Sequence, residues 1–135
     1  MEALENIANL LYEKGEPCNI GCAAKDVEAI KEQLLIEHPT KPIRIVRNWC
    51  LWSLDVTEKD LEGLVLLGLK PVMIYSTDTI WDRYAPYMQG TSVRSTLAIK
   101  FTESYLFETK NTVYVLVEQG SRKRVDPMLA ISVHF

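Results

Sequence analysis

The sequence is poor in the residues on which common catalytic and cofactor motifs depend. It contains two histidines and three cysteines in 135 residues, and its six glycines form no phosphate-binding loop with a following Gly-Lys-Ser/Thr set. The longest apolar run, residues 64–69, is too short to cross a bilayer. An odd number of cysteines does not fit a disulfide framework and suits a reducing compartment. We therefore expect a cytoplasmic protein that needs neither a membrane span nor a cofactor.

An excess of charge of one sign is also missing. The 15 lysines and arginines nearly balance the 18 aspartates and glutamates, which leaves a formal charge of −3. Dedicated nucleic-acid-binding domains are usually clearly basic, so we expect neither DNA nor RNA to be the main partner. The 47% share of hydrophobic residues is typical of globular proteins and is enough to form a core at this length. The chain is expected to be a single domain, residues 1–135.

Helical patterns occupy the first 40 residues. Apolar side chains recur every three or four residues over 4–11 and 27–34, which predicts helices at about 4–14 and 23–38. A third helix is predicted to begin after Thr57, whose hydroxyl can cap it, and to end at Gly68. The chain therefore begins with a helical part, residues 1–40.

Residues 42–135 are predicted to be the sheet-forming part. Their apolar patterns predict strands within 42–54, 72–75, 93–101, 106–107, 112–117 and 129–135. Residues 76–90 are expected to form a long irregular loop, and the basic run at 122–124 falls in a predicted turn before the last strand. Helices followed by strands predict an α+β fold, in which N-terminal helices pack on a largely antiparallel sheet with a C-terminal β-meander.

The few cysteines and histidines do not form a recognisable site. Cys18, Cys22, His38 and Cys50 formally make a Cys₃His set, but their spacing matches no compact zinc motif. Free cysteines are among the most buried side chains, so we expect these to be small core residues. Nothing in the spacing places His38 or His134 beside a nucleophile. The sequence predicts no metal site and no catalytic residue.

One polar pattern leaves an enzymatic alternative open. An arginine, a Ser-Thr strand and a later glutamate loosely resemble ADP-ribosyltransferases, in which such residues hold a nicotinamide dinucleotide. The residues concerned are Arg94, Ser95 and Thr96, followed by Glu103, Glu108 and Glu118. In that class the arginine lies on a separate, earlier strand, which here would have to supply Arg44 or Arg47. Because serine and threonine are common on exposed strand faces, we favour the structural interpretation.

Two clusters of side chains could contact a partner. They are Trp81, Arg83, Tyr84 and Tyr87 in the long loop, and Arg122, Lys123 and Arg124 in the basic turn. The first cluster has the composition of an interface hot spot, and its alternative role is to seal one end of the core. The second would attract an anionic surface, and its alternative is a solvated turn. We expect the aromatic loop to form the centre of a partner-binding surface, with the basic turn at its rim.

Three segments carry turn-and-strand patterns, namely residues 68–75 (GLKPVMIY), 90–96 (GTSVRST) and 106–116 (LFETKNTVYVL). In these segments the chain resembles a small family of uncharacterised bacterial proteins that also occur in phages and prophages. The resemblance leaves the first two helices unmatched and carries no functional residue with it. It implies a bacterial or phage setting, in which small accessory proteins often bind and block a host machine.

The leading hypothesis is a non-enzymatic bacterial or phage accessory protein that binds another protein, with inhibition of a host or defence complex as one form of that function. A nucleotide-transferring enzyme of the ADP-ribosyltransferase type and a weak nucleic-acid binder are the alternatives. The identity of the partner is left open, and a homodimer is among the states considered.

Overall fold

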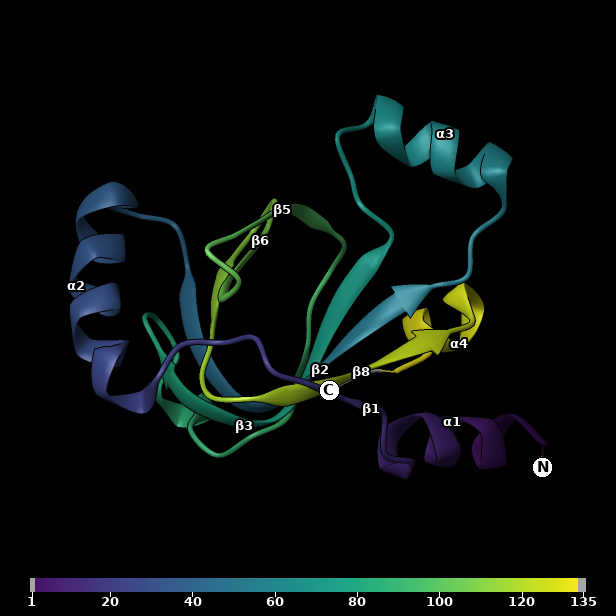
Figure 1. Ribbon diagram of the computed structural model, residues 1–135, viewed down its shortest axis with the longest axis horizontal. Coiled ribbons are helices and arrows are strands. Elements are labelled where there is room, and N and C mark those ends of the chain that lie inside the picture. The colour runs from purple at the N-terminus through teal and green to yellow at the C-terminus, as the bar shows by residue number, and fades with distance from the viewer. Residues whose placement is uncertain (1, 134–135) are drawn as a thin grey trace.

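The computed structural model describes residues 2–133, which form a strongly bent β-sheet flanked by helices (Figure 1). Eight strands in this part of the chain join one sheet with the order β1-β8-β2-β7-β6-β5, while β3 pairs with β2 and β4 pairs with β3. Most neighbouring strands are antiparallel, but β7 and β8 both run parallel to β2. The predicted α+β class is confirmed, and the sheet is mixed.

The bounds of the elements are as follows. The strands are β1 (Glu16–Cys18), β2 (Ile43–Leu54), β3 (Val72–Asp82), β4 (Val93–Arg94), β5 (Ala98–Thr102), β6 (Leu106–Thr109), β7 (Val113–Leu116) and β8 (Gly120–Val125). The helices are α1 (Glu2–Tyr12), α2 (Val27–Glu37), α3 (Glu58–Leu66) and α4 (Pro127–Ile131), with short 3₁₀ turns at η1 (Ala24–Asp26) and η2 (Pro86–Met88).

The longest strand, β2, organises the sheet. β3 runs antiparallel along one edge of β2, from Arg44 opposite Asp82 to Ser53 opposite Val72. On the other edge, β7 pairs with the first half of β2 and β8 with the second half, both in parallel. Most side chains of β2 are buried, as expected of a strand that is covered on both faces.

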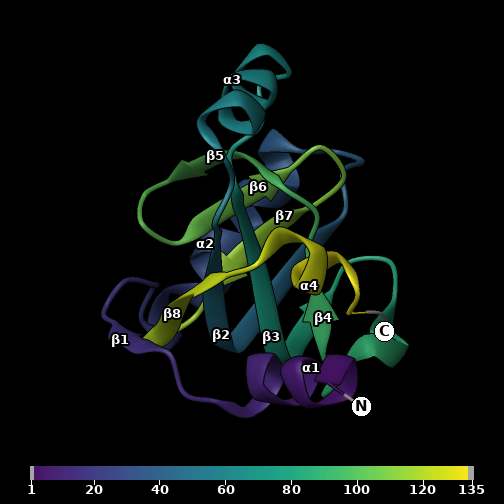
Figure 2. The same cartoon turned by 90° about the vertical axis from the view of Figure 1, so that its right-hand side faces the viewer.

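The sheet curls so that β5 returns toward β3 (Figure 2). β4 pairs with β3, and the same stretch of chain continues into β5, which pairs with β6. Two backbone hydrogen bonds of 2.8 Å connect this stretch to the neighbourhood of β3, from Ser95 N to Ile74 O and from Lys70 N to Ala98 O. Strands β2 to β7 therefore surround an interior, in the manner of a small barrel.

Three apolar clusters fill the inside of this curl and its outer faces. The inside cluster includes Val46, Trp49, Leu51, Ile74, Phe107, Tyr114 and Leu116. α1 and α4 contribute Leu10 and Ala130 to a second cluster around Trp52, and α2 contributes Leu34 to a third around Ile43. α3 is different, because none of its residues is buried.

The three helices predicted in the first half of the chain are confirmed as α1, α2 with its preceding η1 turn, and α3. The hydroxyl of Thr57 accepts a hydrogen bond from Asp60 N at 3.1 Å, so it caps α3 as predicted. β7 is buried along its whole length, as expected of a central strand. β5, β6 and β7 form the antiparallel meander. The helical part also contains β1, a short strand that the sequence pattern did not indicate.

Two predictions about the C-terminal region were wrong. The basic run Arg122-Lys123-Arg124 is not a turn but the middle of β8, which pairs with β1 and β2. The expected strand at 129–135 is instead helix α4, because Asp126 accepts hydrogen bonds from Met128 N and Leu129 N and Pro127 occupies the first helical turn. His134 and Phe135, the end of that predicted strand, lie outside the described residues.

Two further boundaries also differ from the prediction. The expected loop at 76–90 is irregular only in its second half, because β3 continues to Asp82 and pairs with β2 throughout. The expected strand at 93–101 is divided into β4 and β5, which pair with different neighbours. In both cases the tertiary pairing of the strand decides where it ends, and the local pattern does not report that pairing.

A glycine allows β8 to pass close to the core. A Cβ on Gly120 would lie 2.3 Å from the carbonyl oxygen of Trp49 and 2.4 Å from its ring atom Cδ2. The indole Nε1 of Trp49 donates to the carbonyls of Val117 and Glu118 at 3.2 Å each. The ring is thereby fixed over the step between β7 and β8, where Glu118 has a φ of 61°.

We expect Gly120→Ala to destabilise the protein by about 1–3 kcal/mol, because the added methyl group overpacks the contact with Trp49. Urea unfolding followed by far-UV circular dichroism measures this change. Glu32→Ala is the control, since Glu32 is exposed on α2 and an exposed substitution of this kind should change stability by no more than about 0.5 kcal/mol. Equal stability of the two variants would contradict the assigned role of Gly120.

Candidate functional site

The predicted aromatic cluster is divided between the core and the surface. Trp81 lies at the end of β3, packs against the cluster under α2, and has Lys31 Nζ 4.9 Å from its ring centroid. Arg83 donates to the carbonyls of His38, Pro39 and Lys41, just after α2. These two side chains stabilise the fold around the end of α2.

The tyrosines of the same cluster are more exposed. Tyr84 is 56% exposed, but its hydroxyl donates to Thr40 O at 2.7 Å. Tyr87 is 81% exposed. Of the four aromatic-loop residues, Tyr87 is therefore the one whose side chain the fold uses least.

A buried carboxylate that the sequence reasoning missed fixes the start of this loop. Asp82 Oδ2 accepts from Arg44 Nε at 2.6 Å, and Oδ1 accepts from Tyr84 N and Ala85 N at 3.0 Å each. The Asp82 side chain is 3% exposed. All its contacts are structural, since they connect β2 and β3 to the turn that follows β3.

Asp82→Ala is expected to destabilise the protein by about 3 kcal/mol, because it leaves the part-buried Arg44 guanidinium and two backbone N–H groups without their acceptor. Thermal or urea unfolding measures the loss. Tyr87→Ala serves as the control and should leave stability within about 0.5 kcal/mol of the parent. A loss as large as that of Asp82→Ala would show that Tyr87 also supports the fold.

The basic residues of β8 are engaged by neighbours within the chain. Lys123 Nζ donates to the carbonyls of Leu10 and Glu13 at the end of α1, where a cation also complements the helix dipole. Arg122 lies 3.5 Å from a carboxylate oxygen of Glu16, and Arg124 forms an ion pair with Asp55.

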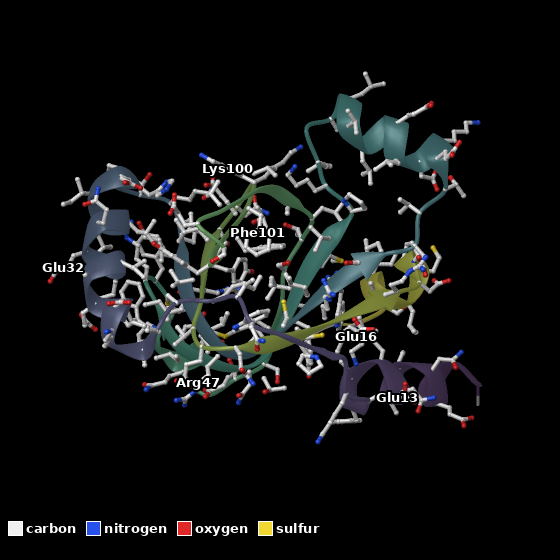
Figure 3. The ribbon with its side chains drawn as sticks, in the orientation of Figure 1. Glu13, Glu16, Glu32, Arg47, Lys100 and Phe101 are labelled. Carbon is white, nitrogen blue, oxygen red and sulfur yellow. The ribbon has the colours of Figure 1, made fainter. Side chains whose placement is uncertain are left out.

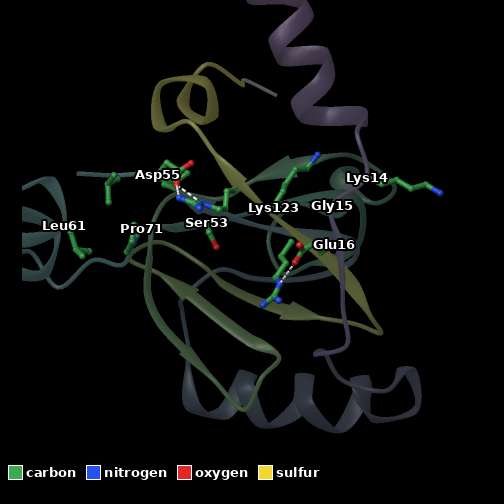
Figure 4. Close-up of a pocket in the computed structure, with 12 residues that line it drawn as sticks. Lys14, Gly15, Glu16, Ser53, Asp55, Leu61, Pro71 and Lys123 are labelled. Carbon is green, nitrogen blue, oxygen red and sulfur yellow. Dashed lines mark hydrogen bonds and ion pairs between the residues drawn. The ribbon is translucent and has the colours of Figure 1, made fainter. Parts of the chain in front are cut away.

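Arg122 and Arg124 line an open cleft of about 840 Å³ beside β8, together with Lys14 and Ser53 (Figure 4). The dashed contacts in Figure 4 show the carboxylates of Glu16 and Asp55 on the two arginines. Glu16 and Asp55 therefore offset two of the four positive charges that line the cleft, which are those of Lys14, Arg122, Lys123 and Arg124.

Ser95 and Glu108 of the enzymatic alternative are engaged by other groups of the chain, while Glu118 lies within electrostatic range of Arg47. Ser95 is buried, and its hydroxyl accepts from Ile74 N at 2.8 Å and donates to Thr96 O at 2.7 Å. Glu108 forms an ion pair with Lys41 at 2.7 Å. The remaining glutamates of the pattern lie in separate turns, with φ values of 56° at Glu103 and 61° at Glu118.

The cysteines are thiols without a shared ligand set. Cys18 is half-buried, and Cys22 and Cys50 are buried in different apolar clusters. Over residues 2–133, no group of three or more His, Cys, Asp or Glu side chains converges in a way that could hold a metal ion. Burial raises the pKa of the Cys22 and Cys50 thiols above the ordinary value of 9.0.

We expect thiol reagents to modify Cys18 in the native protein, while Cys22 and Cys50 react only on unfolding, because burial disfavours the reactive thiolate. Above pH 9 the unfolded chain loses protons from these thiols and the native state keeps them, so the free energy of unfolding should fall as the pH rises. Mass spectrometry after timed alkylation measures the first effect, and urea midpoints between pH 8 and 10 measure the second. Modification of all three thiols at one rate would contradict the assigned burial.

The most exposed apolar surface lies on α3, which projects beyond the sheet between β2 and β3 in both views (Figures 1 and 2). The consecutive residues Leu64, Val65, Leu66 and Leu67 point in four directions, since successive helical residues are rotated by about 100°. Val65 is 66% exposed, Leu66 88% and Leu67 65%. A helical turn that is apolar on all sides is normally buried, and the last turn of α3 contains no buried residue.

α3 and α4 together border an apolar groove of about 480 Å³. The α3 segment lines it with Lys59, Asp60, Gly63, Leu64 and the C-cap Leu67, and α4 with Pro127, Met128 and Ile131. Met73 and Leu97 also line the groove. Met128 is 70% exposed and Ile131 51%. We call the exposed apolar residues of α3 and α4, with this groove, the α3–α4 surface.

The sequence contained the signal for half of this surface. Residues 64–69 are the longest apolar run in the chain, and their pattern predicted the end of a helix without indicating that its apolar residues are exposed. The structure gives that run a different meaning, because it forms the exposed end of α3. The α4 half was missed, because residues 129–135 were assigned to a strand.

These features define the class of the protein, an α+β domain whose bent sheet carries an exposed apolar helix. The family model described as Domain of unknown function (DUF6957) matches residues 19–132, and the chain belongs to that family. The predicted membership in an uncharacterised family is confirmed to that extent. The matched range contains β2 to β8 and both helices of the α3–α4 surface. No curated protein and no solved structure matches the chain.

Within residues 2–133, no helix is both long enough and apolar enough to cross a membrane.

Proposed function

We propose that this chain is a non-enzymatic protein-binding domain, and that it binds its partner through the α3–α4 surface. The observation that supports this proposal is the exposure of α3, which is apolar on all sides of its last turn and contributes no buried residue to its own chain. Soluble monomers rarely leave such a helix uncovered. A partner with an apolar surface would cover it.

The size of the patch fits a protein partner. Six large side chains of α3 and α4 are between 40% and 88% exposed, namely Leu61, Val65, Leu66, Leu67, Met128 and Ile131. Together they offer on the order of 500 Å² of apolar area, comparable with the largest patch on a typical monomer. Such patches mark interaction sites more often than they occur by chance.

The resemblance implies a bacterial or phage setting, and small accessory proteins in that setting often act by binding and blocking another protein. We propose an accessory protein that acts by occupying a surface of its target, as an inhibitor of a host or defence complex does. The enzymatic alternative has less support than protein binding, because Ser95 is buried and Glu108 forms an ion pair with Lys41. The nucleic-acid alternative also has less support, because Arg122 and Arg124 of β8 each form an ion pair within the chain.

Photo-crosslinking tests the surface directly. A photoreactive amino acid is placed at position 66, in the α3–α4 surface, or at position 32, where Glu32 points outward from α2 (Figure 3). We expect a covalent protein adduct from position 66 and none from position 32, in cells that produce the chain. Peptide mass spectrometry of the adduct identifies the protein that was captured.

A third probe at position 87 separates this proposal from the sequence-based one. An adduct from position 87 without one from position 66 would place the interface at the predicted aromatic loop and overturn the α3–α4 assignment. Leu66→Asp provides a competing check, because it should reduce adduct formation from a probe at position 128 and leave the unfolding midpoint unchanged.

A further inference from the structure

We infer that the partner of the α3–α4 surface is a second copy of this chain. In the two-fold dimer that we propose, the two α3 helices lie antiparallel and each enters the groove of the other copy. This inference rests on the proposed function, because it takes the α3–α4 surface to be a protein interface, and it specifies which protein covers that surface.

The chain carries both halves of such an interface. Val65 and Leu66 project from α3 with 66% and 88% of their surface exposed, and an apolar groove of about 480 Å³ borders the same helix. A surface that combines a projecting apolar group with an apolar hollow can be self-complementary in an isologous contact. A two-fold rotation then places each projection in the hollow of the other copy.

Gly63 gives a second helix room to approach. It lies in the middle of α3 and lines the groove, and nothing is found within 4 Å of the position that its Cβ would occupy. Glycine costs about 1 kcal/mol relative to alanine inside a helix. The monomer gains no packing in return for it, whereas a close crossing of two helices would require it.

The charges along α3 favour an antiparallel pair. Glu58, Asp60 and Glu62 outnumber the single cation Lys59 in its first half, the stretch 63–69 is uncharged, and Lys70 follows. A parallel pair would bring the carboxylates of the two copies together. An antiparallel pair centred near Leu64 directs Glu58 of each copy toward Lys70 of the other and places the two helix dipoles in opposition.

The available area is sufficient for a stable dimer. A standard interface buries about 800 Å² per partner, of which somewhat more than half is apolar. The side chains already exposed on α3 and α4 supply on the order of 500 Å² per copy without any rearrangement of the fold. The surface thus has the extent of a complete interface, and no additional apolar patch is needed.

Sedimentation velocity of the full chain at micromolar concentrations tests the dimer. We expect a species of twice the chain mass of 15.4 kDa. Gly63→Arg should raise the dissociation constant by about 100-fold or more, since it blocks the crossing. At a concentration low enough for both chains to be monomeric, the unfolding midpoint of Gly63→Arg should equal or exceed that of the parent, because arginine favours a helix over glycine. A mass of 15.4 kDa for the parent chain, or a dimer unaffected by Gly63→Arg, would overturn the inference.

A charge exchange tests the antiparallel arrangement. Glu58→Lys and Lys70→Glu, each alone, should weaken self-association, because each places like charges together in its own dimer. An equimolar mixture of the two variants should recover dimers that contain one chain of each, detected with a purification tag on one variant. No recovery in the mixture would exclude the antiparallel pairing.

Crosslinking distinguishes failure of the dimer from failure of the proposed function. Adducts from position 66 that join two copies of the chain support both. A chain that sediments as a monomer but forms a position-66 adduct with a different protein overturns the dimer and leaves the binding function intact. The absence of any position-66 adduct overturns both.

Discussion

The fold depends on the need to bury β2 on both faces. β2 is the longest strand, most of its side chains are buried, and it pairs with three different strands. β3 occupies one edge and the pair β7 and β8 the other, so the sheet must bend to enclose Trp49 while Trp52 faces the helices α1 and α4. Gly120 allows this arrangement, since any larger residue would meet the Trp49 ring.

The same strand explains how an exposed helix can be held in a fixed place. α3 replaces the tight turn that would normally join two antiparallel strands, β2 and β3. Leu54 N donates to Pro71 O at 2.9 Å and Asp55 N to Val125 O at 2.9 Å, so the segment begins and ends on paired backbone. The surface that we propose for partner binding is therefore attached to the paired ends of β2 and β3.

Local signals predicted some elements well, and tertiary pairing decided the others. Thr57 and Gly68 marked the limits of α3 correctly, because a side-chain cap and a left-handed glycine act within a few residues of one another. β8 was missed because its three consecutive basic residues resemble a solvated turn, and only its neighbours β1 and β2 reveal a strand. The aromatic cluster was chosen by composition, which cannot tell that Trp81 and Arg83 support the fold.

The formation of α3 is more informative than its exposure alone. Isolated helices of nine residues are marginal in water, and this one buries no residue against its own chain. Its capping hydroxyl contributes about 1 kcal/mol, and Leu69 N adds a hydrogen bond to Leu64 O at 2.9 Å where the helix ends at Gly68. The cap and this hydrogen bond stabilise a short helix and leave its leucines exposed. Exposed apolar side chains promote aggregation when no partner covers them. In the binding that we propose, a helix that is already capped at both ends would lose little conformational entropy when a partner covers its apolar residues.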